Sequence, residues 1–413
     1  MGIIVLAIVM LFLTNKFFDL KNLLNPFVFF YLYQTVFCFI ALSYYEIYNI
    51  SISSELQSYI VIAYLLTFLG GFTSRFLFSK WNIKYVRYDE LSIRRNPSNS
   101  YLVSGFIILI LAVILFLYFT YQTGGVIIFL DEVENSRIER RKGLGMINVI
   151  FITFFLYSFL ILILEKKLSK GLKILIFLFI SFALLSFGSR APFIKFILAI
   201  FLLVGILSTK KHSLKKYFVV GVLSLSIIIV LGALRANISD NVDLLKVIKL
   251  RAGWRPFVNI QNLQRIFDFF PEKHNFMYGK TYLIDLGIFL PGHNPNFGTY
   301  LKDIMNWRFE GGSVTPTFLG IGYINFGKGA FYFYPFIIGF VFNSIYQLIC
   351  NNNVVNISKI IFLILFSIGI SGALSTGIMA ALISNTMFLV FTLLLHYGIK
   401  QIFQKNIKIV KMD

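Results

Sequence analysis

Long apolar runs separated by short polar stretches dominate the sequence. A helix needs roughly 20 apolar residues to cross the hydrocarbon core of a bilayer. Eleven runs reach or approach that length, at residues 2–14, 26–45, 56–74, 101–121, 146–164, 172–187, 191–208, 217–234, 329–350, 357–375 and 377–398. With 58% hydrophobic and 14% charged residues, the chain is also far more apolar than a soluble domain. We therefore predict an all-α polytopic membrane protein with about eleven transmembrane helices.

Basic residues gather in every second connection between these runs. One set of connections holds six basic residues between 75 and 95, four lysines at 166–173, four at 210–216, and the lysines of the C-terminal tail. Such an excess marks the cytoplasmic side of a membrane protein, so we expect the N-terminus outside and the C-terminus in the cytoplasm. Most of the net charge of +20 is then an orientation signal and requires no nucleic-acid partner. The first run lacks the basic start and small-residue cleavage site of a signal peptide and is expected to be retained.

This orientation divides the chain into three parts. Residues 1–234 hold helices 1 to 8, residues 235–315 form a large external loop with the elements of a candidate site, and residues 316–413 hold helices 9 to 11 and a cytoplasmic tail. Cys38 and Cys350 both lie in apolar runs, so neither a disulfide framework nor a thiolate metal site is indicated.

The external loop is rich in arginine. It contains ten basic and seven acidic residues, and five of the ten are arginines, whereas lysine prevails in the cytoplasmic connections. The planar guanidinium group binds two phosphate oxygens at once and stays charged when partly buried. Apolar residues at 257, 260, 263, 267 and 270 predict an amphipathic helix along the membrane surface that begins near Pro256, which leaves open whether Arg251 and Arg255 belong to it. A lipid-linked phosphate or diphosphate suits this loop, and a solvated face with surface ion pairs is the alternative.

Several short motifs resemble one family of membrane enzymes. "YGKTYL" at 278–283, "FLPGHNP" at 289–295 and "GGSVTPTFLGIGYINFG" at 311–327 resemble the C-terminal half of the bacterial O-antigen and capsule repeat-unit polymerases, the Wzy-type family. "TGGVIIFLDEVENSR" at 123–137 and "SFGSRAPF" at 186–193 fit the same pattern. The sequence departs from it at Ile321, where many relatives have glutamate, so a carboxylate that served chemistry there would need a substitute here.

The resemblance implies a glycosyltransferase with a GT-C-like architecture in the bacterial cytoplasmic membrane. Such an enzyme would transfer a growing glycan from undecaprenyl diphosphate onto a newly flipped, lipid-linked repeat unit, and so build O-antigen or capsular polysaccharide. A chain-length regulator and a flippase are partners that the resemblance alone implies. No cofactor and no metal are expected, because Asp-x-Asp and metal-binding histidine pairs do not occur in the sequence.

The candidate site follows from the charge that develops in this reaction. A lipid diphosphate is a good leaving group, so the site mainly has to stabilise negative charge. The predicted catalytic arginines are Arg190, Arg251 and Arg255. Arg190 closes a short external turn, where a charge at membrane depth needs a partner or a ligand. The alternative for Arg190 is that its side chain only extends to the membrane interface and binds no ligand. His293 is the predicted base. Substrate binding is predicted for a further set: Arg137, Arg235, Arg265, Arg308 and Asn294.

Other assignments remain open from the sequence. His274, Asp285, Asp303 and Glu310 are alternative bases, and Asp131 with Glu132 could form an acidic site, although the arginines that follow them also fit a charged helix surface. A ligase that moves finished glycan to a final acceptor is a second enzyme hypothesis. A flippase or transporter is a third, disfavoured because the spans hold almost no charge apart from Lys195 and show no repeated halves.

Overall fold

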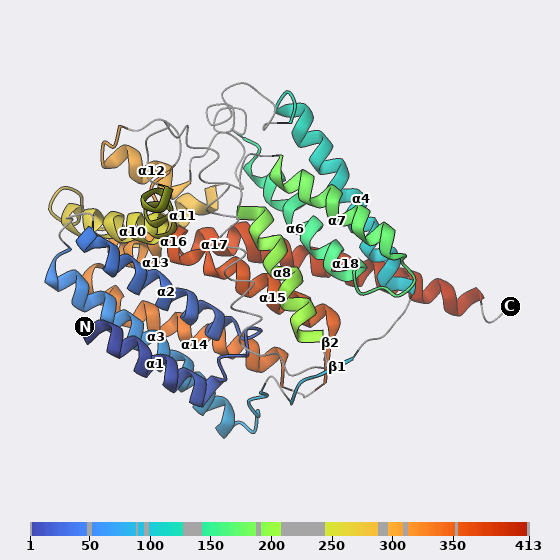
Figure 1. Ribbon diagram of the computed structural model, residues 1–413, viewed down its shortest axis with the longest axis horizontal. Coiled ribbons are helices and arrows are strands. Elements are labelled where there is room, and N and C mark those ends of the chain that lie inside the picture. Colours follow the sequence, from blue (N-terminus) through green and yellow to red (C-terminus); the bar gives the residue numbers. More distant parts are fainter. Residues whose placement is uncertain are drawn as a thin grey trace.

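The computed structural model describes residues 2–47, 52–87, 90–94, 99–126, 143–186, 191–207, 244–287, 296–308, 313–351 and 354–410. These residues are almost entirely helical (Figure 1), so the predicted all-α polytopic fold is confirmed. The N-terminal half of the chain contains α1 (Gly2–Phe18), α2 (Pro26–Ile47), α3 (Ser54–Lys80), α4 (Asn99–Gln122), α6 (Gly145–Leu162), α7 (Lys170–Leu185) and α8 (Ala191–Leu207). The C-terminal half contains α10 (Leu244–Phe269), α11 (Lys280–Leu286), α12 (Phe297–Ile304), α13 (Thr317–Phe326), the short η4 (Gly327–Gly329), α14 (Ala330–Ile349), α15 (Ile357–Ser371), α16 (Ala373–Thr376), α17 (Ile378–Ala381), the π-helical turn η5 (Leu382–Met387) and α18 (Phe388–Val410).

Six helical stretches of the described chain are long and apolar enough to cross a membrane: Ser54–Lys80, Ser100–Gln122, Gly145–Leu162, Thr317–Ile349, Ile357–Thr376 and Ile378–Phe403. Shorter apolar helices cover Val5–Phe18, Pro26–Phe37 and Ala191–Leu207. The predicted span at 217–234 lies outside the described residues, so the expected number of eleven spans stays a prediction. The three-part division of the chain also stays a prediction.

Helices α3 and α14 pack with their backbones almost in contact (Figure 1). A Cβ atom on Gly70 would lie 2.0 Å from the carbonyl oxygen of Phe336, and one on Gly339 would lie 2.0 Å from that of Thr67. Glycine is therefore required on both sides of the crossing, as in other closely packed membrane helices. Asn343 reinforces the contact by donating to the carbonyl oxygen of Gly71 at 3.0 Å.

Connections that were predicted to share one side of the membrane contact each other. At one end, β1 (Ser92–Arg94) pairs in parallel with β2 (Val354–Asn356), with Ser92 opposite Val354. At the other end, Ser53 caps α3 through its hydroxyl and donates its backbone N–H to Gln264 on α10 at 2.9 Å. The two sets of connections thus lie at opposite ends of α3. Which end faces the cytoplasm stays a prediction.

The amphipathic helix of the large loop differs from its prediction. It begins at Leu244, twelve residues before Pro256, and keeps that proline in its interior. A proline removes one backbone hydrogen bond, which tertiary packing can offset. Its apolar residues Phe257, Ile260 and Leu263 are buried, and α10 packs on α2 and α13. Protein therefore covers much of the face that was expected to rest on lipid.

The chain reverses direction in a tight turn between α15 and α18. The reversal lies at Gly377, between the helical stretches Ile357–Thr376 and Ile378–Phe403, and the short α16 leads into it. Gly377 has φ of 92° and ψ of 161°, a combination that is open almost only to glycine. Helices α11, α12 and α10 gather near this turn (Figure 1), which brings parts of the large loop to the same end of the molecule.

Candidate functional site

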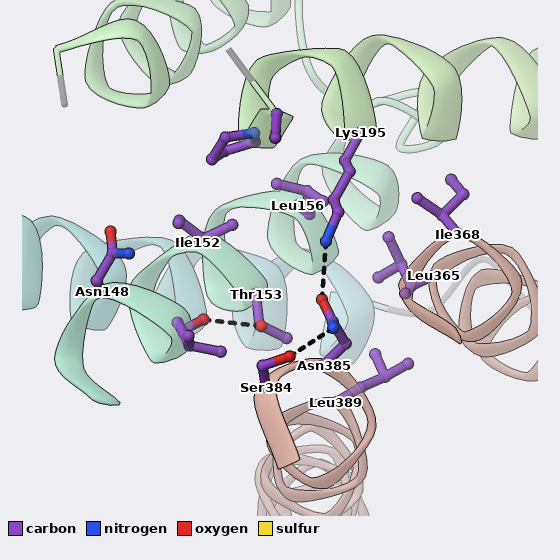
Figure 2. A pocket seen from close by; sticks show the side chains of 14 residues that line it. Asn148, Ile152, Thr153, Leu156, Lys195, Leu365, Ile368, Ser384, Asn385 and Leu389 are labelled. Carbon is purple, nitrogen blue, oxygen red and sulfur yellow. Dashed lines mark hydrogen bonds between the residues drawn. The ribbon is translucent and has the colours of Figure 1, made fainter. Parts of the chain in front are cut away.

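A cavity of about 240 Å³ lies between α6, α8, α15 and the π-helical turn η5 (Figure 2). Its walls come from the start of α8, the first half of α6, the last part of α15 and the segment after the tight turn. These are the ends of the helices that adjoin the connections predicted to be external. Ala191, which follows the predicted arginine Arg190 in the chain, is one of the lining residues.

Lys195 projects into this cavity from α8 (Figure 2). Its Nζ donates a hydrogen bond to Oδ1 of Asn385 at 3.0 Å. The partner is a neutral amide, and no carboxylate lines the cavity among the described residues. An ammonium group inside an apolar helix is costly unless it has a partner or a ligand. The arrangement therefore leaves a positive charge that an anion could balance.

Asn385 is itself held in a fixed orientation. Its Nδ2 donates to the hydroxyl of Ser384 at 2.8 Å and to the carbonyl oxygen of Ala381 at 3.2 Å, which leaves Oδ1 for Lys195. The residue lies in η5, a π-helical turn of a kind often found at functional sites. A Cβ atom on Gly369 would lie 2.7 Å from Cβ of Asn385, so α15 packs tightly behind the amide. The backbone thus positions the partner of Lys195.

A second polar cluster joins α10 to the same tight turn. Asn259 donates to the hydroxyl of Ser375 at 2.8 Å and accepts from the hydroxyl of Thr315 at 2.7 Å. Asn262 also donates to the hydroxyl of Thr315, at 3.0 Å. Ser375, just before Gly377, thus belongs to this cluster, and Asn385, in η5 after Gly377, lines the cavity.

The structure describes only some of the predicted site residues. Arg137, Arg190, Arg235, His293 and Asn294 lie outside the described residues, as do the alternatives Asp131, Glu132 and Glu310. Arg251 and Arg255 lie within α10 and do not precede it, although their side chains are not described.

Arg265 and Arg308, two of the predicted substrate-binding arginines, are exposed on the surface of the large loop. The guanidinium carbon of Arg265 lies 5.0 Å from the ring centre of Trp307, the residue before Arg308. Neither arginine is among the described residues that line the cavity. They stay predictions as substrate contacts.

Two of the alternative bases have structural partners. His274 has Nδ1 at 2.7 Å from the carbonyl oxygen of Asn275 and packs against Phe270. Asp285 is buried and accepts the backbone N–H of Phe297 at 3.0 Å, which caps the connection from α11 to α12. Burial raises the pKa of the Asp285 carboxyl, and the hydrogen bond from Phe297 opposes that shift only in part.

The two motifs of the C-terminal half bind each other. Asn325 of "GYINFG" accepts the backbone N–H of Gly279 and donates to the hydroxyl of Thr281, both in "YGKTYL". Tyr323 donates to the carbonyl oxygen of Phe270 at 2.7 Å, next to the end of α10. These motif residues therefore hold α10, α11 and α13 together, and their side chains are engaged in structure.

Ile321 stands where the polymerase pattern has glutamate. Its side chain is only 2% exposed and packs against Gly377 in the tight turn. Position 321 thus packs against the turn at Gly377, which lies between Ser375 of the polar cluster and Asn385 of the cavity. In this chain the position contributes apolar packing.

The fold defines a polytopic helical membrane protein with a charged cavity at one end of its helices. Residues 3–388 match the family described as "Putative O-antigen polymerase". The chain therefore belongs to the O-antigen polymerase family, and the resemblance seen in its motifs is confirmed. No curated protein and no solved structure gives a significant match, so the GT-C-like likeness stays a prediction.

Lys195 and Asn385 are the candidate residues that the sequence did not single out. The signal for Lys195 was present, because an ionisable residue in an apolar run is a candidate functional residue by default. Asn385 gave no comparable signal, since its importance depends on a partner 190 positions away.

Proposed function

We propose that this protein polymerises oligosaccharide repeat units linked to undecaprenyl diphosphate, on the outer face of the cytoplasmic membrane. Membership of the O-antigen polymerase family supports polymerisation, and the cavity around Lys195 supports binding of an anionic carrier. The single observation on which the site depends is the ammonium group of Lys195, whose hydrogen-bond partner is the neutral amide of Asn385.

The proposed reaction transfers the growing glycan from its carrier diphosphate to a hydroxyl of the incoming unit. Negative charge accumulates on the diphosphate as the sugar leaves, and fixed cations at that position lower the barrier. We place Lys195 against the diphosphate, together with Arg190, which directly precedes the cavity-lining residue Ala191 in the chain. We propose Arg251 and Arg255, within α10, as further cations for the diphosphate.

The acceptor hydroxyl requires a group that orients it and accepts its proton. His293 is our candidate for this role, because the large loop that contains it is expected to lie outside the membrane. Buried Asp285 already accepts a hydrogen bond from Phe297, which makes it a poorer candidate. The proposed chemistry uses side chains of the protein alone.

Extension of a defined substrate by the purified protein tests this function. The protein is incubated in detergent or nanodiscs with undecaprenyl diphosphate bearing the repeat unit of its own organism. A ladder of products that grows by whole repeat units is the expected result. No product longer than one unit would contradict polymerisation. Transfer only to a separate final acceptor would identify a ligase, and accumulation of single units inside cells that lack the gene would identify a flippase.

A further inference from the structure

A second charged pocket lies at the opposite end of α3 from the large loop. Its volume is about 480 Å³, and its walls include Arg75 near the end of α3 and Lys84, Tyr85, Arg87 and Glu90 in the connection that follows. The polymerase chemistry proposed above uses none of these residues. Among the lining residues three are basic and one is acidic, so the pocket has a net positive charge.

The guanidinium group of Arg75 is held in place, but one of its nitrogen atoms has no hydrogen-bond partner among the described residues. Its carbon lies 4.5 Å from the ring centre of Tyr85, a stacked arrangement that holds the planar group in place. Its Nη1 is buried and donates no hydrogen bond to any described part of the chain. A buried donor without an acceptor is costly, and an anion with oxygen acceptors would remove that cost.

The wall behind Arg75 is rigid. The hydroxyl of Tyr85 donates to the carbonyl oxygen of Phe18 at 2.8 Å and accepts from the amides of Asn22 and Asn25 at 3.3 Å each. Asn25 in turn donates to Asn343 on α14 at 2.9 Å. The pocket is therefore built on a buried network between the start of α2, α14 and the end of α3, and a ligand would find Arg75 already in place.

Glu90 supplies a complementary acceptor in the same pocket. Its Oε2 is buried and accepts no hydrogen bond from the described residues. A ligand that combines an anionic group with a hydrogen-bond donor would satisfy Arg75 and Glu90 together. Many lipid headgroups combine a phosphate with a hydroxyl or an ammonium group.

The surroundings place the pocket at a membrane interface. Phe76 and Trp81, on either side of the end of α3, are 52% and 66% exposed. Exposed aromatic residues next to basic ones mark the level of the lipid headgroups. Lys80, between them, lies with Nζ 4.7 Å from the ring centre of Phe76 and is not part of the pocket.

We propose that this pocket binds the headgroup of an anionic phospholipid, with the phosphate at Arg75 and Arg87 and a headgroup hydroxyl at Glu90. Basic pockets between helices on the cytoplasmic side of membrane proteins are suited to such headgroups. The bound lipid would join the end of α3 to the connection that leads to β1. This inference does not depend on the polymerase proposal.

Native mass spectrometry of the purified full chain with added lipids tests the proposal. Phosphatidylglycerol is compared with phosphatidylcholine, which has no headgroup donor for Glu90, and with inorganic phosphate as a competitor. We expect retention of phosphatidylglycerol that is about tenfold weaker in Arg75→Gln and Arg87→Gln, because each loses a charge-assisted hydrogen bond. Arg87 is exposed, so its replacement preserves the fold if Arg75→Gln does not.

The matched control is Lys80→Gln, which removes one charge from the same helix end but leaves the pocket intact. Its retention of phosphatidylglycerol should equal that of the wild type. Equal loss in Lys80→Gln would reduce the effect to general surface charge and overturn the site. Equal retention of phosphatidylcholine, or displacement of the lipid by low concentrations of inorganic phosphate, would also overturn a site for an anionic lipid headgroup.

Discussion

The side-chain oxygen of Asn325 accepts the backbone N–H of Gly279 at 2.8 Å. The Nδ2 of Asn325 donates to the hydroxyl of Thr281 at 2.6 Å and to the carbonyl oxygen of Ile321 at 2.9 Å, so the whole amide is used. Asn325 is fully buried. One amide thus joins the two motifs by which the chain resembles its family. The role of Asn325 in these contacts is structural.

Replacement of Asn325 by alanine should destabilise the protein. The change leaves the buried Thr281 hydroxyl and the part-buried Gly279 N–H without their partner, and an unsatisfied buried group costs about 1–3 kcal/mol. The midpoint of thermal unfolding in detergent should fall clearly below that of the wild type. Asn275→Ala, at an exposed asparagine in the same loop, is the control and should leave the midpoint unchanged. Equal midpoints for both variants would show that the hydrogen bonds of Asn325 between the two motifs do not contribute to stability.

Gly377→Ala should strain the tight turn. Position 377 has φ of 92°, and an added Cβ would lie 2.8 Å from Cγ1 of Ile321. We expect a loss of about 2–4 kcal/mol in the free energy of unfolding, from backbone strain and overpacking together.

A double variant separates the two contributions of Gly377. Removing Cγ1 with Ile321→Ala should make the loss in the double variant smaller than the sum of the two single losses, since contacting residues couple. Gly398→Ala on α18 is the control, because a Cβ there meets nothing within 4 Å and alanine favours a helix. Strict additivity of the two single losses would contradict the packing of Ile321 on the turn.

Asp285→Asn should stabilise the protein at neutral pH. Asp285 is 8% exposed, and burial raises the pKa of its carboxyl above the unfolded value. The folded state therefore takes up the proton first as the pH falls, so in the wild type this group favours folding more at acidic pH than at neutral pH. Asparagine keeps an oxygen for the Phe297 N–H and should remove this dependence. Unfolding midpoints at neutral pH and about pH 5 test it. A variant that is less stable than the wild type at neutral pH would show that the carboxylate is stabilised where it lies.

Hydropathy and charge were sufficient to predict the class of fold. The apolar runs at 56–74, 101–121 and 357–375 each correspond to a helix that can cross a membrane, because the need to bury backbone polar groups in lipid leaves helices as the simple solution. Local rules failed at Pro256, where packing of α10 on α2 and α13 outweighs the preference of proline for a helix start.

The candidate site was less accessible to sequence reasoning. The charge of Lys195 was visible in the sequence, but its partner Asn385 depends on how α8 and η5 meet in space. The pairing of β1 with β2 and the hydrogen bond between Asn325 and Gly279 likewise join segments far apart in the chain, which no local pattern encodes. The arginines were chosen for their chemistry, and that choice remains a prediction for Arg190, Arg251 and Arg255.

The most direct test of the account is the rate of polymer formation by Lys195→Met with the defined undecaprenyl diphosphate substrate. We expect kcat/KM to fall about 100-fold, because a fixed charge that stabilises a developing anion is lost. Lys173→Met is the matched control, since Lys173 lies early in α7 and donates to the carbonyl oxygen of Ile163 away from the cavity. It should retain the wild-type rate. If Lys195→Met, folded and as abundant as the control, extends the glycan at the wild-type rate, the cavity is not where the carrier diphosphate binds.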